Sequence, residues 1–352
     1  MKKKSIALLL MCILFLAILP VCAQKYIVVT FGGDCTLGSE DQLWDRENSF
    51  ISVVNAQGFE YPFKNLVDLF SKDDLTIVNL EGTFHDSKNG KLKKAFNFRA
   101  PSDFAKILPL SKIEAVTLGN NHIFDYGEKG FSSTIKALDA VGTAWFANCR
   151  YENRGYLYEK DGVKIGFVGF YIGDWRKQPS LIRDTIDELK LQGANALVGI
   201  MHGGAEYSSF HDSNQEKMAE WLILNGVSLV IGHHPHVVQG VAVNADSSIV
   251  YSLGNLSFGG NSRIRKQAGD ALLAQVKFSF DDSSNYIGHQ VRLIPIHPSS
   301  TGDKTNNFQP ALADLLNAQR ILAGVQKDTD FILPPYEENI GCTLPFVPVA
   351  VD

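Results

Sequence analysis

Six short polar motifs contain the side chains of this chain whose types could do chemistry together. The motifs are Gly32-Gly33-Asp34, Asn79-Leu80-Glu81-Gly82, Gly119-Asn120-Asn121-His122, His202-Gly203-Gly204, Gly232-His233-His234-Pro235-His236 and Gly254-Asn255. Asp and Glu supply hard oxygen ligands, Asn supplies a neutral amide oxygen, and His supplies a borderline nitrogen. This mixture suits Mn, Fe or Zn in an open site. The motifs offer no set of thiolates, so they do not indicate a structural zinc site.

The positions of these motifs predict that they meet at one edge of a sheet. Each motif comes at the end of a short apolar run rich in Val and Ile, which is typical of strands buried on both faces. The runs cover 26–31, 75–80, 115–118, 164–170, 196–201, 229–231 and 249–253. Ligands of open α/β sheets bind beyond the carboxyl ends of the strands, where glycines allow tight turns. We therefore expect a metal-binding cluster there, and His234 and His236 can reach one centre if Pro235 fixes their turn.

Taken singly, the same residues have ordinary structural explanations. Asp34 could cap a helix, Asn120 could occupy a left-handed turn position, and Glu81 could be a surface charge. Only their joint placement favours a metal site. Histidines outside the motifs are expected to be loop residues with a hydrogen bond; these are His85, His211, His289 and His297. We expect Cys35 to pack in the core.

The remaining pattern predicts an α/β fold. Helical periodicity covers 62–70, 102–110, 129–141, 181–191 and 214–224, and Gly142, Gly193 and Gly226 follow three of these segments as helix-ending glycines. Alternating strands and helices imply parallel pairing with helices covering the sheet. Later, 271–280 and 289–296 should form an antiparallel hairpin, 310–322 can form a helix, and the proline-containing stretch from Leu333 should pack along the surface.

The N-terminal 23 residues are predicted to be a signal peptide. Lys2, Lys3 and Lys4 precede an apolar run that is short for a membrane span, and Val21-Cys22-Ala23 suits a signal peptidase. Lipidation at Cys22 and a retained anchor are the alternatives. The protein is thus expected to be exported, in the periplasm or cell envelope.

The charge and the cysteine count of the predicted mature chain exclude some classes of protein. Cleavage leaves 30 basic and 38 acidic residues, a formal charge of −8, which argues against a nucleic-acid partner. Cys35, Cys149 and Cys342 remain, and their spacing indicates neither a zinc ribbon nor a disulfide scaffold, although one disulfide is possible after export.

The motifs, in this order, resemble the bacterial capsule-synthesis CapA family, which is associated with poly-γ-glutamate capsules and has the calcineurin-like metallophosphoesterase fold. The resemblance spans about 26–260. The matching segments are Phe31-Gly32-Gly33-Asp34, Val78-Asn79-Leu80-Glu81-Gly82, Asn97-Phe98-Arg99-Ala100-Pro101, Asn120-Asn121-His122 with Asp125 and Gly127, His202-Gly203-Gly204-Ala205-Glu206-Tyr207, Gly232-His233-His234-Pro235-His236-Val237 and Tyr251-Ser252-Leu253-Gly254-Asn255.

The resemblance implies a four-layer α/β/β/α sandwich over 24–300, followed by a C-terminal extension, 301–352, packed on it. It also implies one or two divalent ions, with Glu81 bridging two. The implied metal ligands are Asp34, Glu81, Asn121, His202, His234 and His236. His122, Asp125 and Glu206 would form the catalytic group. His122 would not bind the metals and would act as an acid or oxyanion stabiliser. Glu206 would orient His202 or contact the substrate. Arg99 and Asn255 would bind an anionic substrate.

Three departures from ordinary metallophosphoesterases affect these expectations. Thr36 stands where they carry a histidine, and Leu80-Glu81 stands where they carry Gly-Asp, so the first metal has fewer protein ligands. Gly203 replaces an aromatic residue of the family, which predicts a wider pocket.

Two functional classes remain open. The chain is either a metal-dependent hydrolase acting on a phosphoester or a γ-glutamyl amide, or a non-catalytic metal-binding subunit that handles an acidic capsule polymer. In both cases the expected partners are an anionic small molecule or acidic polymer and other capsule-synthesis proteins at the membrane.

Overall fold

The computed structural model describes residues 25–150, 152–260, 268–301 and 305–349. The predicted signal peptide, 1–23, lies outside these residues. Among the described residues, none of the helices has the length and apolar character needed to cross a membrane.

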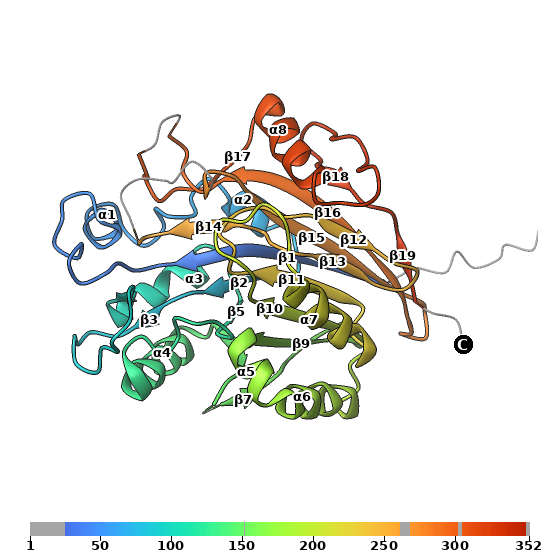
Figure 1. Cartoon of the computed structure of the whole chain (residues 1–352), viewed down its shortest axis with the longest axis horizontal. Coiled ribbons are helices and arrows are strands. Elements are labelled where there is room, and N and C mark those ends of the chain that lie inside the picture. The colour runs from blue at the N-terminus through green and yellow to red at the C-terminus, as the bar shows by residue number, and fades with distance from the viewer. Residues whose placement is uncertain (1–24, 151, 261–267, 302–304, 350–352) are drawn as a thin grey trace, which may run out of the picture.

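The predicted strands form, and they belong to one curled sheet that has 17 strands within the described ranges (Figure 1). Its parallel part runs through β1 (Lys25–Thr36), β2 (Leu75–Leu80), β5 (Ala115–Thr117), β6 (Ala144–Asn148), β9 (Val163–Tyr171), β10 (Ala196–His202), β11 (Leu229–His233) and β13 (Ser248–Val250). Parallel pairing brings the carboxyl ends of neighbouring strands to the same edge. The sheet is therefore built to gather the polar motifs.

Antiparallel strands complete the sheet on both sides. The predicted hairpin is β15 (Ala271–Phe280) and β16 (Tyr286–His297), and β15 also pairs with β1. The shorter antiparallel strands are β7 (Asn153–Arg154), β8 (Tyr156–Lys160) and β12 (Val241–Val243). In contrast, β14 (Asn255–Phe258) pairs parallel with β1, and β3 (Thr83–Phe84) and β4 (Arg99–Ala100) form a separate parallel pair. The C-terminal strands β17 (Ala311–Leu312), β18 (Cys342–Thr343) and β19 (Val347–Pro348) all pair with β16.

Three hydrophobic cores separate four layers. In β2, Ile77 faces the core between the two halves of the curled sheet, whereas Val78 faces a second core beneath α1 (Phe50–Gln57), α2 (Val67–Phe70), η1 (Ser102–Lys106), α3 (Ile107–Leu110) and α4 (Gly127–Val141). In β10, Val198 lies in the inner core and Leu197 in a third core, beneath α5 (Ile172–Lys177), α6 (Pro179–Leu191) and α7 (Ser213–Leu224).

The α/β/β/α layering expected from the resemblance is thus confirmed. The two β layers are halves of one sheet joined at β6, which pairs with β5 on one side and with β9 on the other. Helix α8 (Leu315–Gln326) covers the inner core beside β16 (Figure 1).

Several helices differ from the predicted ranges. Of 62–70, only Val67–Phe70 is α-helical, because the residues before it form turns such as Leu66 N–H to Phe63 O. The 102–110 segment starts as the 3₁₀ helix η1, and the helix predicted at 310–322 begins at Leu315, where the Asp314 side chain accepts the backbone N–H of Asn317. Helices α1 and α5 were not predicted, since both are short.

Candidate metal centre

The carboxyl edge of the sheet brings together the acidic and histidine residues of the motifs. Asp34 lies near the end of β1, Glu81 directly follows β2, and His202 ends β10. His234 and His236 come from the turn after β11, and β14 places Asn255 beside Asp34 through a parallel pairing. Segments distant in the sequence therefore meet because neighbouring parallel strands end at the same edge.

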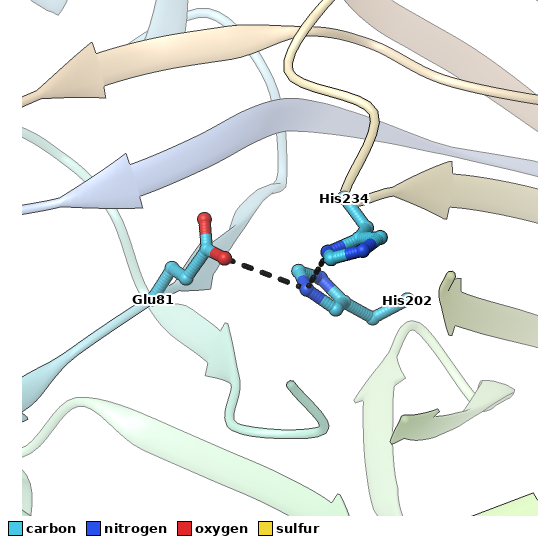
Figure 2. A group of neighbouring side chains, drawn as sticks. All are labelled: Glu81, His202 and His234. Atoms are coloured by element: carbon cyan, nitrogen blue, oxygen red, sulfur yellow. Dashed lines mark hydrogen bonds and ion pairs between the residues drawn. The ribbon is translucent and has the colours of Figure 1, made fainter. Parts of the chain in front are cut away.

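Three groups of side chains could each hold a metal ion. Within each group, the possible ligand atoms lie within 4.8 Å of one another. They are Asp34 with Glu81 and His236, Glu81 with His202 and His234, and Glu206 with His234 and His236. Figure 2 shows the second group, in which Glu81 Oε1 lies 3.5 Å from His202 Nε2 and His234 Nδ1 lies 3.1 Å from the same nitrogen. Glu81 belongs to two groups, so its two oxygens can serve two centres.

Glu81 provides the clearest sign that the site holds a cation. Its side chain is completely buried, and neither carboxylate oxygen has a hydrogen-bond partner. Burying a charged group costs several kcal/mol unless a partner compensates for it. Buried charges in proteins are paired or bind metals. A divalent ion in either group would supply the missing partner, so the residues present fit a metal.

The pKa values of the two carboxylates show how strongly the site attracts positive charge. Burial raises the pKa of Asp34, but hydrogen bonds and charge from His233 and His236 outweigh it and hold the pKa well below 3.8. Burial and Asp34 raise the pKa of Glu81, yet His236 and His202 bring it to about 2. Both groups are therefore carboxylates at neutral pH, ready to act as ligands.

The two histidines of the turn after β11 differ in protonation. Burial lowers the pKa of His236, but the charges of Glu81 and Asp34 overcome it and raise the pKa to about 10. Burial and the neighbouring His202 lower the pKa of His234 to about 3. His234 is thus a neutral imidazole, the form that binds metals. His236 carries a proton in the metal-free protein, beside the two carboxylates, and must release it to act as a ligand.

These two histidines have strained backbone conformations that the surrounding structure must hold. The φ angles of His234 and His236 are 98° and 59°, in the region that L-residues rarely adopt. Such positions cost about 1–3 kcal/mol each and occur where surrounding structure enforces them. Between them, the Pro235 carbonyl accepts the backbone N–H of Tyr207 at 2.8 Å. The turn therefore presents both imidazoles to the cluster, His236 in the group with Asp34 and His234 in the group with His202.

An amide chain that the sequence did not predict links Asp34 to the loop after β5. The Asn79 side chain donates to Asp34 Oδ1 at 2.7 Å, and its own oxygen accepts from Asn120 at 2.9 Å. The Asn120 oxygen in turn accepts the backbone N–H of His122 at 3.0 Å. A usable signal was present, because Asn79 and Glu81 are two apart at a strand end and so share a face.

His122 and Asp125 form a closely hydrogen-bonded pair beside the carboxylates. His122 Nδ1 lies 2.7 Å from Asp125 Oδ2, and His122 Nε2 lies 4.0 Å from Glu81 Oε1. Phe98 packs on the His122 ring with centroids 4.7 Å apart. His122 therefore points its second nitrogen toward the candidate centre. Asn121 lies beside it, with its side-chain oxygen 2.7 Å from His202 Nε2.

The predicted substrate contacts lie in different surroundings. The Asn255 oxygen is 2.9 Å from His236 Nδ1, within the cluster. Glu206 is exposed at the edge of the cluster, close to His234 and His236. Arg99 is buried, donates to Asp41 at 2.7 Å, and stacks on the Trp44 ring at 3.7 Å. In this structure the Arg99 guanidinium thus faces Asp41.

The structure shows the surroundings of Thr36 and Gly203, two positions where the sequence departs from the expected pattern. Thr36 is fully buried, and its hydroxyl has no hydrogen-bond partner. A Cβ atom at Gly203 would lie 2.9 Å from Met218 and 3.0 Å from Ile172, so position 203 faces the packed core beneath α5 and α7. The expectation that Gly203 widens the pocket is therefore wrong.

His233 joins the cluster although it was not among the predicted ligands. It is buried, and its Nδ1 lies 3.2 Å from Asp34 Oδ1. Cys35, Cys149 and Cys342 are all buried in this structure.

The comparison with protein families decides where the chain belongs. Residues 28–259 match the family described as bacterial capsule synthesis protein PGA_cap. The chain belongs to this family. The matched range contains every motif from Asp34 to Asn255. The resemblance inferred from those motifs is therefore confirmed.

Two curated relatives carry names from capsule and PGA biosynthesis. The chain is 29% identical to the capsule biosynthesis protein CapA of Bacillus anthracis over 260 residues, covering 67% of this chain and 60% of that protein. It is 25% identical to the PGA biosynthesis protein CapA of Bacillus subtilis (strain 168) over 299 residues, covering 79% and 74%. The chain thus spans less than two thirds of the first relative.

A solved structure, TT1561 of Thermus thermophilus, is similar with a TM-score of 0.37 and 11% identity, covering 71% of this chain and 94% of that one. The layered fold described above stands on the strands and cores of this chain itself.

Proposed function

We propose that this chain is an exported metal-dependent hydrolase of metallophosphoesterase type, acting in capsule or poly-γ-glutamate biosynthesis on a phosphoester or γ-glutamyl amide. The single observation that carries the proposal is Glu81, a buried carboxylate without a hydrogen-bond partner, which is shared by two ligand groups next to the His122–Asp125 pair. The names of the relatives from Bacillus anthracis and Bacillus subtilis support the biosynthetic setting.

The residues that would hold one or two divalent ions (Mn, Fe or Zn) are the predicted six. Asp34, Glu81 and His236 supply one group, and Glu81, His202 and His234 supply the other, with the Asn121 oxygen beside His202. A bound divalent ion acts as a Lewis acid and lowers the pKa of water, which provides a nucleophile at neutral pH. Glu81 would be the bridge.

His122 is proposed as the acid that protonates the leaving group. Asp125 Oδ2 lies 2.7 Å from His122 Nδ1 and would accept its N–H, which orients the ring and leaves Nε2 facing Glu81. With a proton on both nitrogens, and the Asp125 carboxylate balancing the charge, the ring would give the Nε2 proton to the leaving group and return to its neutral form, or would stabilise developing negative charge. Glu206, exposed beside His234 and His236, is proposed to contact substrate at the open side of the cluster, and Asn255 to contact it near His236.

The substrate is proposed to be anionic, either a small molecule or a segment of an acidic polymer, and other capsule-synthesis proteins at the membrane are the proposed partners. An anionic substrate suits a centre that holds one or two divalent ions.

A non-catalytic metal-binding subunit is the second candidate, and Thr36 favours it. Its hydroxyl replaces the histidine expected at that position, so the group around Asp34 has fewer strong ligands. Such a subunit would bind and pass on an acidic polymer without cleaving it.

Turnover separates the two candidates. The metal-loaded protein should hydrolyse at least one of p-nitrophenyl phosphate, bis-p-nitrophenyl phosphate and a γ-glutamyl anilide when Mn²⁺ is added. A wild-type protein that contains metal but turns over none of these would favour the accessory subunit.

A further inference from the structure

We infer that Lys94 is a positioning residue that locks the His122–Asp125 pair and the Asn121 backbone into one rigid unit. The inference rests on the proposed function, because it concerns the residues assigned to proton transfer. Lys94 does not belong to any of the polar motifs at the strand ends. It comes from the lysine-rich stretch Lys91-Leu92-Lys93-Lys94, which by sequence looks like a solvated loop.

The Lys94 ammonium group contacts the His122–Asp125 pair and the Asn121 backbone. Its Nζ donates to Asp125 Oδ1 at 2.5 Å and to the Asn121 carbonyl at 2.8 Å, and it lies 3.4 Å from His122 Nδ1. Hydrogen bonds from a charged donor to a carboxylate are about twice as strong as neutral ones. One side chain thus connects the carboxylate that orients His122 to the backbone that presents Asn121.

The segment around Lys94 is folded about Asp125. The backbone N–H of Leu92 donates to the Asp125 carbonyl at 2.8 Å, and the Asn97 side chain donates to the same oxygen at 3.1 Å. The backbone N–H of Phe98 donates to Asp125 Oδ2 at 2.7 Å. Lys94 therefore reaches Asp125 from a segment that is itself anchored there, which keeps the ammonium group in place.

Charge and burial make Lys94 necessary for this arrangement. The Asp125 side chain is completely buried, whereas that of Lys94 is 29% exposed. An unpaired buried carboxylate is costly, and His122 alone would leave Asp125 Oδ1 without a donor. Lys94 balances the charge of Asp125 and leaves Oδ2 for His122 Nδ1.

The test compares Lys94→Met, Lys94→Arg and the control Lys93→Met, in which an exposed neighbouring lysine is lost. Small displacements of a catalytic group can cost about 10² in rate. On the p-nitrophenyl or γ-glutamyl substrate that wild type cleaves fastest, Lys94→Met should lower kcat by about 10²-fold. KM should stay nearly unchanged, and Lys94→Arg should recover most of kcat. Lys93→Met should behave as wild type.

A second readout needs no turnover. In zinc-loaded protein with ¹⁵N-labelled histidine, the ring signals of His122, assigned by their loss in His122→Asn, should report a Nδ1-protonated ring in wild type. In Lys94→Met they should shift toward mixed tautomers, and in Lys93→Met they should not move.

The outcomes separate this inference from the proposed function. If wild type cleaves no substrate, the hydrolase proposal fails while the His122 spectrum still tests Lys94. An unchanged His122 spectrum in Lys94→Met would overturn the inference. So would a raised KM with unchanged kcat, which would make Lys94 a substrate contact instead.

Discussion

Replacing Glu81 with glutamine tests whether this carboxylate bridges two ions. The substitution keeps the shape of the side chain and removes the charge that both ligand groups share. Glu81 is completely buried, neither of its oxygens has a hydrogen-bond partner, and it is the residue common to the two proposed ligand groups. We expect Glu81→Gln to lose metal at both groups, whereas His202→Ala leaves the group of Asp34, Glu81 and His236 intact.

The size of the effect follows from binding linkage. One ion at 100 times its Kd stabilises the folded state by about 2.7 kcal/mol. Each kcal/mol shifts Tm by about 2–4 °C in domains of 150–250 residues, so one ion should raise Tm by about 5–11 °C. With Mn²⁺, wild type should show the shift of all bound ions, His202→Ala a reduced shift, and Glu81→Gln almost none.

Differential scanning calorimetry of metal-free protein titrated with Mn²⁺ measures these shifts. Glu220→Gln, an exposed acid on α7, is the matched control and should keep the full wild-type shift. The bridging assignment is refuted if Glu81→Gln keeps the wild-type shift, or if Glu81→Gln and His202→Ala lose equal amounts.

Four further predictions concern the site and the N-terminus. His122→Asn should keep its metal and lose about 10²–10⁴ in kcat; metal loss in this variant, measured by mass spectrometry, would instead make His122 a ligand. His234→Ala removes a ligand of the group formed with Glu81 and His202 and should bind about half of the wild-type metal, and a full complement would exclude His234 as a ligand. The lowered pKa of His234, about 3, means that unfolded protein gains a proton below pH 6.5 that the metal-free native state does not, so the His234 contribution to stability should fall by about 2 kcal/mol between pH 7 and 5. Urea unfolding of metal-free wild type and His234→Asn should show that the variant lacks this part of the loss; equal losses would contradict the assigned burial. N-terminal sequencing of the exported protein should begin at Gln24, and Met1 or a lipidated Cys22 would show that the predicted cleavage is wrong.

The strands and the edge where polar residues gather could be predicted from the sequence because both follow from local pattern. Runs such as 75–80 are buried at every position, and Glu81 comes directly after that run. Parallel order then requires the motif ends to meet, whatever the details of packing. The same reasoning does not reveal that the two β layers are one sheet, since that depends on β6 pairing on both sides.

Side-chain partners could not be predicted because they depend on which surfaces the fold brings together. Arg99 is predicted to bind substrate, and the sequence does not reveal that Asp41 and Trp44, from the loop before α1, contact its guanidinium. Lys94 belongs to none of the motifs, but folding of its segment around Asp125 turns its ammonium group toward the His122–Asp125 pair. In both cases the partner lies in a separate loop, at a distance along the chain that no local pattern records.

The central claim is that Asp34, Glu81 and the histidines form a metal centre. Mass spectrometry of protein purified without chelators tests it most directly, with Glu81→Gln prepared in parallel. We predict one or two equivalents of Mn, Fe or Zn in wild type and less than a tenth of that amount in Glu81→Gln. Wild-type protein that binds none of these metals, even after incubation with each, would contradict the claim.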